Sequence, residues 1–127
     1  VLKTVKPKIV FNTDVVFTTG PKMRAHIDHE KWALANGIGN FEALKAMTST
    51  GGELAALTGE NNPYGGKIGV IQEGALADII IVDGNPLKDI SAIGGNSEWL
   101  DAPPRGPEVE PIKLIMKDGV VYKNTLN

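Results

Sequence analysis

The spacing of hydrophobic and polar positions changes along the chain, and the changes predict a helical part and a β-rich part. Residues 8–11 (KIVF) are a brief run of β-branched and aromatic side chains closed by polar residues, which predicts a short buried strand. Between Lys22 and Asn36 the apolar residues recur at helical spacing. Gly37 follows where a glycine commonly ends a helix. We therefore expect a strand followed by a helix.

Two further helices are predicted before residue 60. Asn40 is a favourable N-cap, and apolar residues follow it at helical spacing. Thr50 and Glu53 have the spacing of a capping box, which predicts a short helix that runs through Leu57 and ends at Gly59. Glycines in its first turn weaken this third helix.

The second half of the chain is typical of a small β layer. Asp118-Gly119 between two apolar runs predicts a hairpin, because a type I′ turn needs positive φ at both central residues. Residues 94–111 are rich in proline, glycine and charge, and we expect a long irregular loop there. Short apolar runs predict strands at 67–71, 77–82, 112–116 and 120–122.

Together these elements predict an α/β fold with a boundary near residue 60. We place residues 1–60, with the first strand and the helices, in one part and residues 61–127, with the β layer, in the other. The length of 127 residues suits one ordinary domain.

Charge and composition exclude several classes of function. The net charge of -2 provides no basic surface for nucleic acid or anionic lipid. No apolar run approaches the roughly 18 to 20 residues that span a bilayer. The absence of cysteine excludes disulfides and thiolate chemistry, and it is compatible with any compartment.

His26 and His29 are the only histidines, and they lie three residues apart on the first predicted helix. Residues at this spacing share a helix face, so the pair is a candidate for metal binding. The simpler interpretation is a solvated face beside Asp28, Glu30 and Lys31. We favour it, because two imidazoles make an incomplete metal site.

Asp78 and Asp83 flank the apolar run at residues 79–82. Two carboxylates can share acid–base work, but on a strand residues five apart point to opposite faces. We therefore expect these aspartates at turns and strand ends, where Asp is favoured.

Asp14 follows the predicted strand at 8–11 and is itself followed by an apolar run. A carboxylate between two such runs is unfavourable to bury without a partner. One interpretation is a turn residue that bonds to its own backbone. The other is a carboxylate at the C-terminal end of a barrel strand, where (β/α)₈ enzymes place their chemistry. Composition and spacing do not choose between the two.

Four stretches of the sequence, in order, resemble the C-terminal part of a metal-dependent amidohydrolase. They are FNTD, EALKAMTSTGGELAALTG, NPYGGKIGVIQEGALADIIIVDGNPLKDI and IKLIMKDGVVYKN. The branch that the chain resembles is the imidazolonepropionase and Xaa-Pro dipeptidase-like group. The resemblance runs from about Lys8 to Asn124 and is most specific over residues 66–90. It implies the last strand and helices of a (β/α)₈ TIM barrel, together with the C-terminal part of a small β-sandwich.

The resemblance also implies a role for Asp14. An aspartate follows the eighth barrel strand in this family, usually within Gly-Thr-Asp; Thr13 and Asp14 match this motif and Asn12 replaces the glycine. By resemblance, Asp14 contacts the more buried of one or two divalent metals, often zinc. It also moves a proton from the metal-bound hydroxide to the leaving amine. The expected reaction is hydrolysis of an amide or other C–N bond, in a dipeptide or a small cyclic amide.

The remaining metal ligands of the family, a His-x-His pair among them, are absent from this sequence. A (β/α)₈ barrel takes about 250 residues, so 127 residues do not supply one plus a sandwich. We therefore expect the chain to be inactive alone. Its expected partners are the N-terminal part of the barrel and further copies, in a homo-oligomer. The alternative is a non-catalytic α/β subunit or binding module in which Asp14 is only a turn residue.

Overall fold

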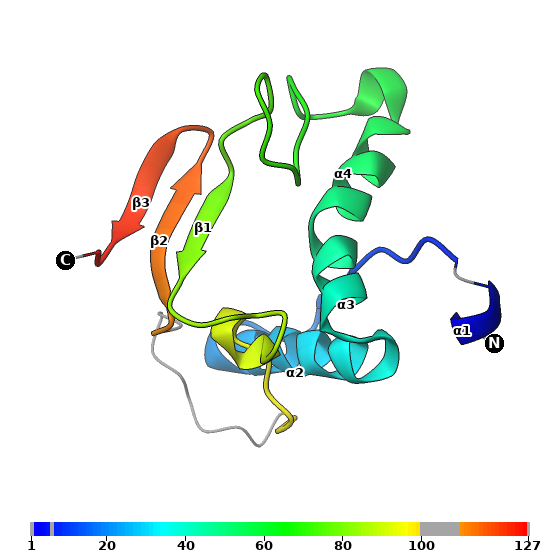
Figure 1. Cartoon of the computed structure of the whole chain (residues 1–127), viewed down its shortest axis with the longest axis vertical. Helices are drawn as coiled ribbons and strands as arrows, with labels where there is room; N and C mark the ends of the chain where they lie inside the picture. The colour runs from blue at the N-terminus through cyan, green and yellow to red at the C-terminus, as the bar shows by residue number, and fades with distance from the viewer. Residues whose placement is uncertain (1, 6, 100–109, 127) are drawn as a thin grey trace.

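The computed structural model describes residues 2–5, 7–99 and 110–126, without the side chains of residues 2 and 3. Helices lie on one side of the molecule and a small sheet on the other (Figure 1). Among the described residues, no helix combines the length and the apolar character needed to cross a membrane. The elements are α1 (Leu2–Val5), α2 (Gly20–Ile38), α3 (Asn40–Met47), α4 (Ser49–Ala56), η1 (Gly59–Asn61), β1 (Ile79–Val82), η2 (Ile90–Ile93), β2 (Ile112–Lys117) and β3 (Val120–Asn124).

The helix α2 is longer than the sequence predicts at both ends. It begins at Gly20, with Pro21 in its first turn, where the missing N–H of proline does no harm. Gly37, which we expected to end the helix, lies inside it. Gly39 is the C-cap instead: its φ of 90° suits glycine, and its N–H donates to the carbonyl oxygen of Ala35.

The helices α3 and α4 confirm the two further predicted helices, but their N-termini differ from the prediction. Gly39, not Asn40, is the N-cap of α3. Thr48 precedes α4, and no side chain caps this helix. The predicted capping box is therefore wrong, because Glu53 pairs with Lys8 from the N-terminal segment instead.

The strand predicted at residues 8–11 is absent from the structure. Residues 7–16 carry no regular secondary structure, and the side chains of Ile9 and Phe11 are only half-buried. The Phe11 N–H donates to the carbonyl oxygen of Ala46 at the end of α3, at 3.1 Å. Among the described residues no other strand lies beside this segment, so its backbone bonds to a helix end instead.

The sheet has three antiparallel strands in the order β1-β2-β3. The predicted hairpin is confirmed: Asp118 and Gly119 join β2 to β3 with φ of 50° and 78°. The strand predicted at 67–71 is wrong. That stretch contributes only an isolated bridge between Lys67 and Ala75, because residues 72–75 turn back at once.

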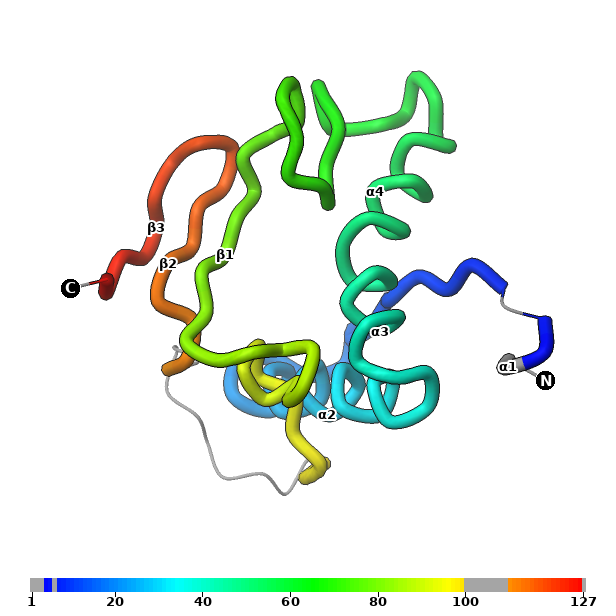
Figure 2. Tube along the Cα trace, viewed as in Figure 1, coloured from blue at the N-terminus to red at the C-terminus, as the bar shows by residue number. Residues whose placement is uncertain are grey.

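The hydrophobic core joins the helices to η2. Ala35 of α2 and Ala43 of α3 pack with Ile90 and Ile93 of η2. These small helix residues let the elements approach closely, and the trace in Figure 2 shows η2 lying against α2. Partly buried residues that surround this cluster are Trp32, Leu34, Ile38, Leu44, Met47 and Val82.

Asp78 stabilises the β2–β3 hairpin from the start of β1. Its carboxylate accepts a hydrogen bond from the backbone N–H of Asp118 at 2.8 Å and an ion-paired hydrogen bond from Lys117 at 3.1 Å. The bond from the Asp118 backbone and then that from Lys117 lower the pKa of Asp78. The expected strand-end role of this aspartate is confirmed.

Asp78→Asn is expected to lower the melting temperature at neutral pH. Because the folded-state pKa of Asp78 is lowered, its contribution is present above the unfolded pKa of about 4 and is lost as pH falls through the folded value. The difference from wild type should therefore close in acid. Thermal melts at pH 7 and pH 3 measure this. Asp83→Asn is the control: its carboxylate lies 3.9 Å from Lys113 and is 75% exposed, so a change comparable to that of Asp78→Asn would contradict the assignment.

Candidate functional site

Asp14 lies in an irregular segment with its side chain exposed. Its φ is 44°, and among the described non-glycine residues only Asp118 shares a positive φ. The hairpin turn explains Asp118, whereas no regular element explains Asp14. A left-handed backbone costs a non-glycine residue about 1–2 kcal/mol, and Asp is among the residues that tolerate it. The backbone of Asp14 is therefore left-handed, a feature that the sequence pattern alone did not indicate.

Two contacts attach the segment before Asp14 to the helices. The Phe11 N–H bonds to Ala46, which is fully buried on α3, and Lys8 forms an exposed ion pair with Glu53 of α4. The hydrogen bond from Lys8 lowers the pKa of Glu53, because it stabilises the charged form of the carboxylate. The backbone that leads to Asp14 is thus held on α3 and α4 while the carboxylate itself stays open.

The two histidines lie on a shared face of α2, as their spacing predicts, but the face is not simply solvated. The rings of His26 and His29 each lie 4.6 Å from the ring of Trp99. His26 Nε2 bonds to Glu30 at 3.0 Å, and His29 Nδ1 bonds to the carbonyl oxygen of Ser97 at 3.1 Å. The expectation of a solvated face is wrong, because residues 96–99 fold back over this part of α2.

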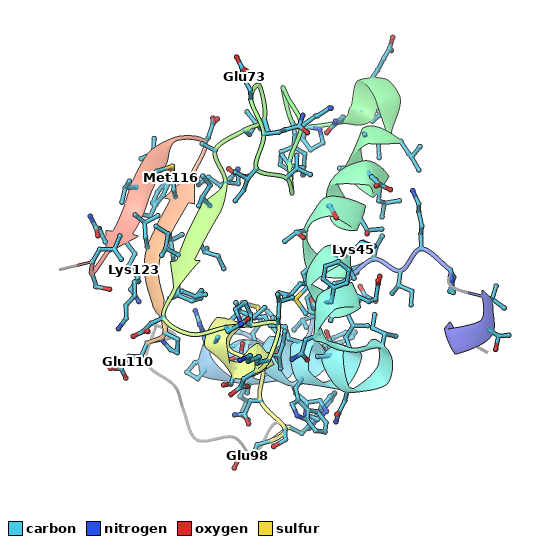
Figure 3. All side chains as sticks on the ribbon, in the orientation of Figure 1. Lys45, Glu73, Glu98, Glu110, Met116 and Lys123 are labelled. Carbon is cyan, nitrogen blue, oxygen red and sulfur yellow. The ribbon has the colours of Figure 1, made fainter. Side chains whose placement is uncertain are left out.

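Carboxylates and imidazoles do not gather into one cluster. Across the part of the chain that the structure describes, no group of three or more His, Cys, Asp or Glu residues is placed to hold a metal ion. Glu73 and Glu98, for example, lie at opposite ends of the molecule (Figure 3). Among the described residues, Asp14 therefore belongs to no group of three potential metal ligands.

A buried ion pair on α2 was missed by the sequence reasoning. Asp28 is 1% exposed, and its carboxylate accepts a hydrogen bond from Lys31 at 3.0 Å. Lys31 also donates to the carbonyl oxygen of Ile93 in η2. The only sign of this pair in the sequence is that Asp28 and Lys31 are three residues apart. Many exposed ion pairs on helices have the same spacing, so it does not indicate burial. The pair joins α2 to η2 and has a structural role.

A hollow of about 520 Å³ lies between α4 and the loop of residues 62–72. Its lining includes Ser49, Glu53, Tyr64 and Lys67, and it contains neither Asp14 nor a histidine. It is therefore separate from the candidate site at Asp14.

No protein-family model matches the sequence, and no curated protein does either. Solved structures do match. An amidohydrolase is similar over 99% of this chain and 25% of its own, with 28% identity and a TM-score of 0.70. An uncharacterized protein is similar over 97% of this chain and 25% of its own, with 26% identity and a TM-score of 0.68.

A third similar structure is a prolidase in complex with N-methylphosphonate-L-proline. It covers 82% of this chain and 21% of its own, with 28% identity and a TM-score of 0.57. The chain thus spans about a quarter of the length of the structures it matches. The resemblance to amidohydrolases, with a prolidase among them, is confirmed at the level of the α/β fold.

Proposed function

We propose that this chain is the C-terminal portion of a metal-dependent amidohydrolase. Nearly all of the chain resembles about a quarter of an amidohydrolase structure. The similarity over 99% of the chain to an amidohydrolase carries the proposal. The exposed carboxylate of Asp14, on a residue with a left-handed backbone outside any regular element, adds a candidate reactive group.

In this proposal residues 1–60 are the end of a (β/α)₈ barrel and residues 61–127 belong to a small β-sandwich. Residues 8–11 become the last barrel strand when the rest of the barrel, on another chain or segment, supplies its neighbours. A strand needs hydrogen-bond partners on its edges, which is a physical reason for its absence from the chain by itself. Asp14 then follows the C-terminal end of that strand, where barrel enzymes place their catalytic groups.

This chain supplies one ligand, Asp14, to the proposed metal site. Residues outside this chain supply the other ligands. A carboxylate is a common ligand of zinc and of harder divalent ions, and that of Asp14 is accessible. One or two bound divalent ions, zinc in our proposal, would lower the pKa of water and polarise the substrate carbonyl. His26 and His29 are not part of the proposed site, since among the described residues they belong to no group of three potential ligands placed to hold a metal ion.

Asp14 has the proton-transfer role in the proposed reaction. Water adds its oxygen to the carbonyl carbon, and the C–N bond of the amide breaks. The carboxylate of Asp14 accepts the proton that the attacking water loses. It then donates that proton to the nitrogen, which leaves as an amine. Such general acid–base transfer contributes ~10²–10⁴-fold to a rate.

The proposed substrate is a dipeptide with proline at its C-terminus. The support is the similar prolidase, whose ligand is a phosphonate joined to L-proline. A small cyclic amide is a second substrate of the same reaction class, because its hydrolysis also breaks a C–N bond. A panel of both kinds of compound distinguishes them.

The metal content of the protein tests the site directly. The isolated chain is expected to retain less than one tightly bound divalent ion, since the described residues bring no three potential ligands together. The chain assembled with the rest of the barrel is expected to hold one or two. Elemental analysis after gel filtration measures both. A stoichiometric zinc in the isolated chain that His26→Ala removes would contradict the assignment of Asp14.

A further inference from the structure

The helices α3 and α4 are separated by a single residue, Thr48. Its φ of -126° and ψ of -96° are not helical, so the hydrogen-bond ladder of α3 stops there. Thr48 completes this helix end itself: its N–H donates to the carbonyl oxygen of Lys45 at 3.1 Å, and its hydroxyl donates to that of Leu44 at 2.7 Å. We call residues 46–49 the α3–α4 junction.

The junction provides the acceptor that holds the segment before Asp14. In an unbroken α-helix the carbonyl of Ala46 would accept a hydrogen bond from the N–H of residue 50. Because the ladder is interrupted at Thr48, this carbonyl is available to the N–H of Phe11, from which it accepts a bond at 3.1 Å. Ala46 is 1% exposed, so losing this partner would leave a buried carbonyl at a cost in free energy.

The loop of residues 66–70 packs directly on the same junction. A Cβ on Gly69 would overlap the backbone carbonyl group of Thr48. In the first turn of α4, a Cβ on Gly52 would likewise overlap the carbonyl of Ile68. Two glycines therefore let this loop lie in contact with the start of α4, close along the chain to the carbonyl that holds the segment before Asp14.

That segment is attached on both sides of the junction. Phe11 bonds to α3 before the junction, and Lys8 pairs with Glu53 of α4 after it. We call these two contacts the anchors. A shift of α4 relative to α3 at Thr48 would change the distance between the anchors, which are only three residues apart on the segment.

We propose that Gly69 is a positioning residue: by packing its loop on the α3–α4 junction, it fixes the anchor of Phe11 and thereby the backbone that leads to Asp14. The effect on catalysis rests on the proposed function, whereas the effect on the Phe11 anchor does not. Phe11 is the last residue of the proposed barrel strand, so its bond to α3 is compatible with strand pairing at residues 8–10.

The main comparison is between Gly69→Ala and Gly74→Ala. Gly74 has a φ of 78°, against 75° for Gly69, but a Cβ there would meet nothing within 4 Å. A second pair of variants keeps the test valid if Gly69→Ala does not fold. Thr48→Val removes the hydroxyl at the junction, and Thr58→Val removes a similar bond, to the carbonyl oxygen of Ala55 at 2.6 Å, away from the junction.

The first readout is the amide hydrogen exchange of Phe11 in the full 127-residue chain, relative to the amides of the β2–β3 hairpin. This ratio is expected to rise about 2- to 12-fold in Gly69→Ala and in Thr48→Val, which corresponds to the net stability of one hydrogen bond. Both control variants should leave the ratio unchanged. A purely global loss of stability would speed exchange in the hairpin as well, so it would not raise the ratio.

The second readout is kcat and KM for an Xaa-Pro dipeptide in the chain assembled with the rest of the barrel. Gly69→Ala is expected to lower kcat about 100-fold with little change in KM, as when a distant substitution displaces a catalytic group by about 1 Å. Gly74→Ala should keep the wild-type kcat.

An unchanged exchange ratio for Phe11 in folded Gly69→Ala, or in Thr48→Val if the former does not fold, would overturn the inference. An unchanged kcat in Gly69→Ala, with Asp14→Asn inactive, would overturn it as well. Failure of the proposed function is recognised separately: no dipeptide is hydrolysed, or Asp14→Asn hydrolyses them like wild type, whatever the exchange of Phe11 shows.

Discussion

Asp14→Asn is expected to lower turnover by ~10²–10⁴-fold in the chain assembled with the rest of the barrel, because the variant loses the proton acceptor of the proposed reaction. Asparagine has nearly the same volume as aspartate and tolerates the φ of 44° at this position. The backbone should therefore stay as it is, and the fold stability should change little or rise, as when a functional charge is removed. Dipeptide turnover and melting temperature measure the two effects.

Asp118→Asn is the matched control for this substitution. Asp118 is the other described non-glycine residue with positive φ, at 50°, and it lies in the β2–β3 turn far along the chain from Asp14. The chemical change and the backbone class are the same, but no catalytic role is proposed for this side chain. A comparable loss of turnover in both variants would show that the effect is not specific to the proposed site.

Gly69→Ala is expected to destabilise the assembled protein by roughly 2–5 kcal/mol. Gly69 has a φ of 75°, and a Cβ at this position would overlap the backbone carbonyl of Thr48, just before α4. The left-handed conformation costs alanine about 1–2 kcal/mol, and overpacking typically adds 1–3 kcal/mol. The loop at residues 66–70 would have to move away from α4. Urea denaturation measures the change in the free energy of unfolding.

Gly74→Ala separates the two contributions to this loss. Gly74 has a φ of 78°, almost the same as Gly69, but a Cβ there would meet nothing within 4 Å. The control should therefore lose only the conformational part, about 1–2 kcal/mol. If the two alanine variants were equally stable, the close approach between the loop and α4 would not hold in solution.

Local interactions explain which elements were predictable from the sequence. The turn at Asp118-Gly119 depends on the φ preferences of two adjacent residues, so its sequence is sufficient to predict it. The helices α2, α3 and α4 follow from apolar spacing over one or two turns. Their ends were less predictable, since Gly37 and Gly39 are equally plausible caps by sequence and only the backbone of Gly39 adopts the required φ.

The two predicted strands that the structure lacks depend on pairing with other segments. Residues 8–11 have the composition of a strand, but a strand requires a neighbour, and the described part of the chain pairs Phe11 with Ala46 instead. Residues 67–71 do not form a strand for a related reason. The glycines in this stretch let it lie against α4, and only Lys67 forms a β-bridge, with Ala75. Apolar pattern indicates the tendency of a segment, whereas pairing decides its structure.

The candidate site also has features that the sequence indicated and features that only the structure shows. The position of Asp14 after an apolar run was visible in the sequence, but its positive φ and its exposure were not. The spacing of His26 and His29 predicted a shared face correctly. It did not predict the contact with Trp99, because 70 residues separate Trp99 from His29 and no local rule connects them.

The catalytic role of Asp14 is tested by the rate of Xaa-Pro hydrolysis per bound metal ion, compared between wild type and Asp14→Asn in the chain assembled with the rest of the barrel. Normalising by metal content separates the loss of a ligand from the loss of a proton acceptor. If Asp14 transfers the proton, the rate per metal is expected to be at least about 100-fold lower in Asp14→Asn. A wild-type rate per metal in that variant would contradict the catalytic role and leave Asp14 as a residue of a turn.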